Sequence, residues 1–249
     1  MSAGTRIPGS RSPEPRSPEP RGPRPGDADA AARELPAQRG AAVGRVLSGA
    51  LVRGGWRVRV LGEWRVPTQG PVILAANHSN FLDGPLLLGV SPRPVHFLVK
   101  QEFFRWPLGP LLRGVGQIPI DREGADRRAI TSAVSVLEQG GAVGVFPEGT
   151  RLSGGAFAQV RNGLTYLALR ADAPVVPVAV FGTNGRGTSV NALPAPRARI
   201  DVVFGDAFRV GDGTGRRTRT VLREAAETVK ERLTGHLESS RELVGGDRT

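Results

Sequence analysis

The chain of 249 residues carries 34 Lys and Arg against 23 Asp and Glu, a formal net charge of +11. This length can bury a sizeable core, and a hydrophobic content of 39% excludes a wholly disordered or fibrous chain. The absence of cysteine excludes disulfides, a thiolate nucleophile and a cysteine-based zinc site. The charge suggests a phosphate-bearing partner, which would be nucleic acid, an anionic membrane or a phosphorylated substrate.

Residues 1–40 have the composition of a tail. The pentapeptide RSPEP occurs twice in tandem from Arg11 to Pro20, and seven prolines fall within the first 25 residues. Proline removes backbone donors and few apolar side chains are available to bury, so we predict a disordered tail rich in Pro and Arg. No apolar run has the length of a secretory signal or a transmembrane helix, and we predict neither. The folded domain is expected over residues 41–249.

An apolar run with cationic and aromatic flanks begins that domain. Residues 41–52 (AAVGRVLSGALV) contain Arg45 as their only charge, and several Arg and Trp residues follow over residues 53–65. Residues 41–120 hold nine cations and three anions, so the charge excess is concentrated there. The pattern predicts an amphipathic segment over residues 41–56 that lies in the interface of an anionic bilayer. The alternative is a short helix packed on the body of the domain.

From residue 57 onward, apolar runs with strand character alternate with helical patterns. We predict strands over residues 57–62, 71–76, 95–99, 117–120, 142–146, 175–181 and 199–204. We predict helices over residues 81–90, 127–139, 163–170 and 217–237, with short helical pieces between residues 99 and 117. Apolar strands between helices are typical of a layered α/β domain. We therefore expect a mixed, largely parallel sheet flanked by helices, whose strand order the sequence does not reveal.

Missing motifs exclude several classes of protein. The chain lacks the G-x-S-x-G elbow of hydrolases, the G-x-x-x-x-G-K-[ST] phosphate loop and the G-x-G-x-x-G dinucleotide motif. Its three histidines, His78, His96 and His236, are too dispersed for a catalytic metal site, so we expect no metal. Aromatic residues make up only 5% of the chain, which argues against nucleic-acid binding by base stacking.

The sequence NHSNFLD follows an apolar strand, at the place where α/β sheets carry reactive groups. His78 and Asp83 are five residues apart and would be separated by about 140° on one regular helix. They can meet only if His78 lies in a loop and Asp83 begins the next helix. Asp83 would then fix the imidazole tautomer and leave the other ring nitrogen to act as a base on a substrate hydroxyl. The alternative is that Asp83 merely caps a helix and His78 fills a loop.

Two further motifs follow predicted strands. In FPEGTR, Pro147 and Gly149 favour a turn that a ligand can approach closely, and Arg151 offers a bidentate cation suited to phosphate. In IPIDR, Arg122 is placed just beyond a strand in the same manner. Each motif by itself is also compatible with a turn that carries a surface ion pair.

The four blocks NH-x4-D, IPIDR, FPEGTR and VVPVAVFG, in this order, resemble the 1-acylglycerol-3-phosphate acyltransferase (lysophospholipid acyltransferase) family from about Gly62 to Asn184. The resemblance implies that His78 is the catalytic base and Asp83 its orienting partner. It implies acceptor binding by Arg122, Glu148, Gly149, Thr150 and Arg151. It assigns Pro177 to the acyl-donor side, and Lys100 resembles a lysine common after the first block.

The chain departs from the family pattern at two places. Asn80 stands two residues after the histidine, where many members have serine, and we expect it to hydrogen-bond within the loop. Arg161 stands where many members have lysine, which keeps the charge but replaces a point charge by a planar fork. We therefore expect activity to survive and the headgroup preference to differ.

The resemblance implies an acyltransferase without a cofactor, with acyl-CoA or acyl carrier protein as the donor. The expected acceptor is a lysophospholipid, above all 1-acylglycerol 3-phosphate, which would give phosphatidic acid in phospholipid biosynthesis. Alternative acceptors are glycerol 3-phosphate, another lysolipid or a glycolipid, and the non-enzymatic alternative is a basic membrane-binding module. We expect a peripheral or monotopic location on the anionic cytoplasmic face of the cell membrane, and no nucleic-acid partner.

Overall fold

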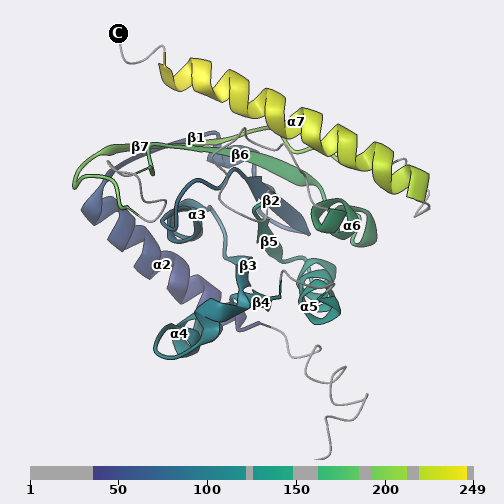
Figure 1. Cartoon of the computed structure of the whole chain (residues 1–249), viewed down its shortest axis with the longest axis horizontal. Coiled ribbons are helices and arrows are strands. Elements are labelled where there is room, and N and C mark those ends of the chain that lie inside the picture. Colours follow the sequence, from purple (N-terminus) through teal and green to yellow (C-terminus); the bar gives the residue numbers. More distant parts are fainter. Residues whose placement is uncertain (1–35, 122–125, 148–161, 185–191, 212–218, 246–249) are drawn as a thin grey trace, which may run out of the picture.

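The computed structural model describes residues 36–121, 126–147, 162–184, 192–211 and 219–245 (Figure 1). The strands are β1 (Arg57–Leu61), β2 (Val72–Ala76), β3 (Val95–Lys100), β4 (Ile118–Ile120), β5 (Ala142–Val145), β6 (Val175–Phe181) and β7 (Arg199–Phe204). The α-helices are α2 (Gln38–Gly55), α3 (Asp83–Val90), α4 (Leu108–Gly114), α5 (Arg127–Glu138), α6 (Asn162–Arg170) and α7 (Arg219–Gly245). Two 3₁₀ helices, η1 (Glu63–Arg65) and η2 (Gln101–Phe104), follow β1 and β3.

The seven strands form one sheet in the order β1-β7-β6-β2-β5-β3-β4. Strands β6, β2, β5, β3 and β4 run parallel, whereas β7 pairs antiparallel with β6 and parallel with β1. This confirms the predicted mixed, largely parallel sheet. Strand β2 lies in the middle, so the end of β2 is flanked on both sides by the carboxyl ends of parallel neighbours.

Helices cover both faces of the sheet, which explains why its central strands are apolar throughout. Side chains of β2 alternate between two cores, because Val72 and Leu74 pack on one face and Ile73 and Ala75 on the other. The first core includes residues of α2 and α3, and the second includes residues of α5, α6 and α7 (Figure 1). The molecule is therefore a three-layer α/β/α domain.

The observed strands begin and end within one residue of the predicted bounds, but two helices are longer than predicted. Helix α7 continues to Gly245 instead of ending at residue 237, because Ser240 and Val244 extend its buried stripe. The sequence did not predict this extension because residues 238–242 are all polar or charged. Helix α2 begins at Gln38, so the last three residues of the predicted tail belong to the helix.

Helix α2 packs closely on α3 through small residues. A Cβ on Gly89 would lie 2.5 Å from the backbone nitrogen of Gly49, so neither position has room for a larger side chain. The guanidinium groups of Arg53 and Arg45 donate to the carbonyls of Gly89 and Ser91 at the end of α3. Segment 41–56 is thus packed on the domain along one face, as the alternative interpretation required.

Arg93 ties three loops together at the amino-terminal edge of the sheet. Its guanidinium donates to the carbonyls of Pro67 and Gly70, at 3.0 and 2.8 Å, and to that of Gly140. We expect Arg93→Ala to lower the free energy of unfolding by about 2–3 kcal/mol, because three carbonyls lose a charged donor. Urea denaturation measures this loss, and Arg93→Lys should be intermediate. An unchanged midpoint for Arg93→Ala would contradict the account.

Buried histidines make stability depend on pH. His96 is 3% exposed, and its Nδ1 bonds to the carbonyl of Gly116 at 2.6 Å. Burial lowers the pKa of His96 and also that of His236. The unfolded chain protonates these groups near pH 6.5 while the folded chain keeps them neutral, so stability is lost as the pH falls below about 6.5. Urea denaturation between pH 7.5 and 5 should show this loss, and His96→Gln should reduce it. An equal loss in wild type and variant would refute the role of His96.

Candidate active site

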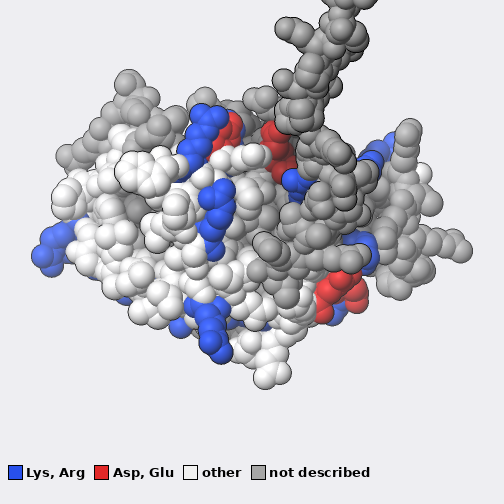
Figure 2. Space-filling model, turned by 90° about the horizontal axis from the view of Figure 1, so that it is seen from below, with Lys and Arg blue, Asp and Glu red and all other residues white. Residues whose placement is uncertain are grey.

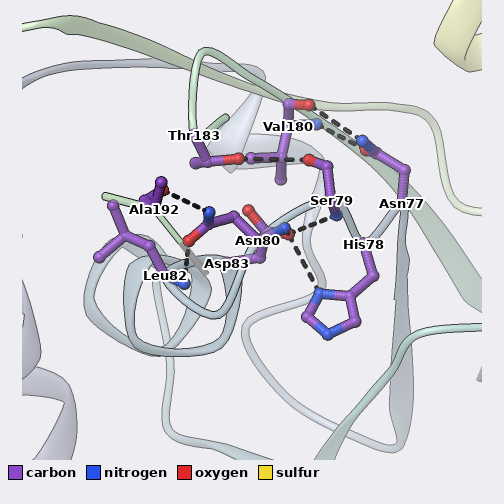
Figure 3. Close-up of polar contacts among 9 residues, drawn as sticks. All are labelled: Asn77, His78, Ser79, Asn80, Leu82, Asp83, Val180, Thr183 and Ala192. Carbon is purple, nitrogen blue, oxygen red and sulfur yellow. Dashed lines mark hydrogen bonds and ion pairs between the residues drawn. The ribbon is translucent and has the colours of Figure 1, made fainter. Parts of the chain in front are cut away.

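The NHSNFLD loop connects the buried end of β2 to the first turn of α3 (Figure 3). His78 lies in the loop and Asp83 is the first residue of α3. Their side chains meet, with Nδ1 of His78 3.0 Å from Oδ2 of Asp83. The chain therefore curls back as the five-residue spacing required. Asp83 is fully buried and His78 is 11% exposed.

Asp83 organises the loop as well as the histidine. Its Oδ2 accepts the backbone N–H groups of Ser79 and Asn80, at 2.7 and 2.8 Å, in addition to the contact with His78. Because this carboxylate oxygen is an acceptor, Nδ1 of His78 carries the proton in the neutral ring and Nε2 carries the lone pair. Nε2 lies on the side of the ring away from Asp83, which is the geometry of a base on a substrate hydroxyl.

The orientation of the imidazole is also fixed by stacking. The ring of His78 lies on that of Phe146, with centroids 4.2 Å apart and an angle of 23° between the planes. Phe146 follows β5, the strand beside β2, and stacks in turn on Phe97 of β3 at 5.6 Å. A stack of two phenylalanines, one directly after β5 and one within β3, therefore supports the ring.

Asn77 and Ser79, for which the sequence predicted no role, hold the loop against β6 and the residues that follow it. The side-chain amide of Asn77 donates to the carbonyl of Val180 at 3.0 Å and accepts its N–H at 2.8 Å. The hydroxyls of Ser79 and Thr183 lie 3.3 Å apart (Figure 3). Asn77 thus continues the backbone ladder beyond the end of β2. An asparagine directly after an apolar strand was the available signal, but its partner lies 103 residues away.

Asn80 forms the hydrogen bonds within the loop that were expected of it. It is 1% exposed, its Oδ1 accepts the N–H of Leu82 at 3.0 Å, and its Nδ2 donates to the carbonyl of Ala192 at 2.8 Å. The longer side chain therefore binds a segment outside the loop as well as the loop itself. This gives the departure from serine a structural function.

The structure does not bring every predicted residue to His78. Pro177 is buried in β6 opposite Ala75 and lies next to Gly205, on the face of the sheet covered by α7, whereas α3 covers the other face. Its role on the acyl-donor side stays a prediction. Lys100 is the last residue of β3 and lies, like His78, at the carboxyl ends of the parallel strands. It pairs with Glu102 at 2.6 Å and lowers the pKa of that carboxyl.

The remaining predicted residues, Arg122, Glu148, Gly149, Thr150, Arg151 and Arg161, lie outside the described residues. Their roles in acceptor binding stay predictions. Within the described ranges, no three His, Asp or Glu side chains are grouped so that they could hold a metal ion.

A His–Asp pair with a buried carboxylate lies at the central strand ends of an α/β sheet and has the geometry that a general base requires. Comparison with known proteins specifies the class. The family model described as Acyltransferase matches residues 57–181, half of the chain, so the protein belongs to the acyltransferase family and is an acyltransferase enzyme. The match includes His78 and Asp83 together with the IPIDR and FPEGTR motifs.

Named relatives and a solved structure agree with this family. A 1-acyl-sn-glycerol-3-phosphate acyltransferase of Bacillus subtilis is 26% identical over 73% of this chain and 88% of its own length. A lyso-ornithine lipid O-acyltransferase of Pseudomonas aeruginosa is 37% identical over 50% of this chain and 47% of its own length. The crystal structure of the 1-acyl-sn-glycerophosphate acyltransferase PlsC from Thermotoga maritima has the same fold, with a TM-score of 0.60 at 21% identity over 86% of this chain and 88% of that chain.

Proposed function

We propose that the enzyme transfers a fatty acyl group from the thioester of acyl-CoA or acyl carrier protein to the free hydroxyl of a lysophospholipid. The preferred acceptor is 1-acylglycerol 3-phosphate, and the product is phosphatidic acid. The observation that carries the proposal is the 3.0 Å contact between Nδ1 of His78 and the buried Asp83 carboxylate. The acceptor named for the Bacillus subtilis relative supports this choice of substrate.

The reaction needs one base and no protein nucleophile. Nε2 of His78 takes the proton of the acceptor hydroxyl while its oxygen attacks the thioester carbonyl. The carbon–sulfur bond then breaks, the thiolate leaves with the electron pair, and the imidazolium returns the proton to it. The Asp83 carboxylate stabilises the imidazolium between these steps, as in other His–Asp pairs. We propose that neither a metal nor another cofactor takes part.

Arg151 and Arg122 are proposed to bind the acceptor phosphate, on the grounds of their motifs alone. Arg151→Ala is expected to raise the KM for 1-acylglycerol 3-phosphate by about 10-fold or more, because a charged hydrogen bond is worth about 1.5–3 kcal/mol. The kcat should change less. Initial rates at varied acceptor concentration measure both constants. An unchanged KM would remove Arg151 from the phosphate site.

We further propose that the enzyme works peripherally on the anionic cytoplasmic face of the cell membrane, through α2. The face of this helix away from α3 exposes large apolar side chains that are 57–65% accessible: Val43, Val46, Leu47 and Leu51. They repeat at helical spacing, and Arg39 and Arg53 lie near the two ends. This combination favours an anionic interface. None of the helices in the described ranges has the length and hydrophobicity to cross a bilayer.

The proposed function is tested by identifying the lipid product. The purified chain is incubated with acyl-CoA, or with acyl carrier protein as donor, and with a panel of acceptors, and the products are analysed by mass spectrometry. The panel contains 1-acylglycerol 3-phosphate, glycerol 3-phosphate, other lysophospholipids, a lyso-ornithine lipid and a glycolipid. Phosphatidic acid as the main product supports the proposal. A different acylated product would revise the acceptor, and no acyl transfer from either donor would refute the reaction.

A further inference from the structure

We propose that the corner formed by η2 and α4 is a second bilayer-docking element that binds an anionic phospholipid surface beside α2; this rests on the proposed function. Trp106, between η2 and α4, is 86% exposed, and Leu111 on α4 is 57% exposed. Tryptophan prefers the membrane–water interface because its ring is apolar and its N–H is polar. The two exposed side chains are five positions apart in one short segment, and contiguous exposed apolar surface marks an interaction site.

Two arginines flank these apolar side chains. Arg105 and Arg113 are both exposed and line an open cavity of about 400 Å³. Within the described residues neither of them forms an ion pair, and the guanidinium of Arg113 lies 5.5 Å from the centre of the Phe104 ring. Cations beside an exposed tryptophan complement the negative potential of an anionic leaflet.

Acidic residues do not cancel this charge. Glu102 and Asp121 also line the cavity, but Glu102 pairs with Lys100 at 2.6 Å. With Lys100 included, the corner has three cations against two anions, Glu102 and Asp121. Figure 2 shows the face at the bottom of Figure 1, where α4 lies, as a mainly uncharged surface with separate cationic side chains and few acidic ones. The corner therefore combines apolar surface with net positive charge.

The corner is continuous with the exposed stripe of α2. A Cβ on Gly44 of α2 would lie 2.8 Å from the Cβ of Val115, directly after α4. A Cβ on Gly40 would overlap the carbonyl oxygen of Gly114. The two helices are thus in close contact at the end of α4, and both lie in the lower left of Figure 1. The corner and α2 therefore form one continuous part of the molecule.

The corner is also continuous with the catalytic loop. Phe103 of η2 lies against Phe81, with ring centroids 5.8 Å apart, and Phe81 is only three residues after His78. Strand β3, which leads into η2, lies two positions from β2, about 10 Å across the sheet. If this corner docks on a bilayer, the strand ends that carry His78 come close to the bilayer surface, where a lysophospholipid acceptor resides.

The proposal is tested by the depth of single tryptophans in vesicles. The chain has three tryptophans, and the variant Trp56→Phe/Trp64→Phe retains only Trp106, while Trp56→Phe/Trp106→Phe retains only Trp64. Trp64 is a matched control because it is 75% exposed and follows β1, the strand at the opposite edge of the sheet from β4. Vesicles of phosphatidylcholine and phosphatidylglycerol with brominated acyl chains should quench Trp106 and not Trp64. Bound protein with unquenched Trp106 overturns the proposal.

The contribution of charge is measured by co-sedimentation with the same vesicles. Arg105→Gln/Arg113→Gln should weaken binding by about fivefold for each arginine, and Trp106→Ala should weaken it by about tenfold. Arg223→Gln/Arg241→Gln removes two exposed cations from α7, on the far side of the domain, and should have a smaller effect (Figure 1). Equal losses for the two arginine pairs would show that only net charge matters and would overturn the assignment.

Two controls separate this inference from its alternatives. Acyl transfer to a detergent-dispersed acceptor tests the proposed function without vesicles, so Trp106→Ala should keep that activity while it loses vesicle binding. Loss of both in a folded protein would contradict a docking role. Sedimentation velocity tests whether the corner binds a second copy of the chain instead. The proposal would be overturned if the protein formed a dimer that Trp106→Ala dissociates and if vesicles did not quench Trp106.

Discussion

Replacement of His78 by alanine is expected to lower turnover by about 10²–10⁴-fold, because the acceptor hydroxyl loses its general base. The fold should survive, since the loop backbone is held independently of the ring, by Asp83 through the N–H groups of Ser79 and Asn80. Initial rates of phosphatidic acid formation at saturating donor and acceptor measure the loss. Thermal unfolding of the variant and of the wild type, measured side by side, tests whether the variant remains folded.

A second histidine supplies the matched control for this variant. His236 on α7 bonds to the carbonyl of Val203 on the opposite side of the domain, and His236→Gln should retain turnover. Normal acyl transfer by His78→Ala would remove the general base from the mechanism. A similar loss in both variants would indicate a general effect on the fold.

Replacement of Asp83 by asparagine is expected to lower kcat by about 10²–10⁴-fold with little change in KM. The amide oxygen can still accept the N–H groups of Ser79 and Asn80, but the neutral side chain no longer stabilises a protonated His78. Its amide nitrogen would replace Oδ1, a buried atom without a hydrogen-bond partner among the described residues. The donor is therefore left unsatisfied, and a modest loss of stability should accompany the loss of rate.

A comparison with Asp83→Ala separates catalysis from helix capping. Alanine also abolishes the acceptor for the loop N–H groups, so it should destabilise the protein more than asparagine does. If Asp83 merely capped α3, the asparagine variant would keep its rate and only the alanine variant would be impaired. That outcome would refute the role of Asp83 as the orienting partner of His78.

The layered fold could be predicted because its central strands are short, apolar and separated by helical patterns. Residues 72–76 and 175–181 are almost entirely buried, and such runs have few alternatives in an α/β domain. The strand order could not be predicted, because pairs such as β2 with β6 join residues about 100 positions apart. No local pattern encodes which of several similar apolar strands become neighbours.

The His78–Asp83 contact was predictable for the opposite reason, because both residues belong to one loop and the start of one helix. The support around it is not local: Asn77 bonds to β6, Asn80 bonds to Ala192, and Phe146 comes from β5. These contacts depend on the strand order, so they follow only from the folded structure. The face of the sheet on which Pro177 lies likewise follows only from the folded structure, and its role on the acyl-donor side stays a prediction.

The central claim is that the acceptor hydroxyl attacks the thioester directly, with His78 as its base and no acyl-enzyme. The most direct measurement is the time course of CoA release on rapid mixing of enzyme and acyl-CoA, with and without lysophospholipid. The chain contains no cysteine, so a thiol reagent reports the released CoA alone. Direct attack predicts that CoA is released only with acceptor present, in an amount equal to the acylated lipid, and that this release is lost in His78→Ala. A burst of CoA equal to the enzyme concentration without acceptor would contradict it.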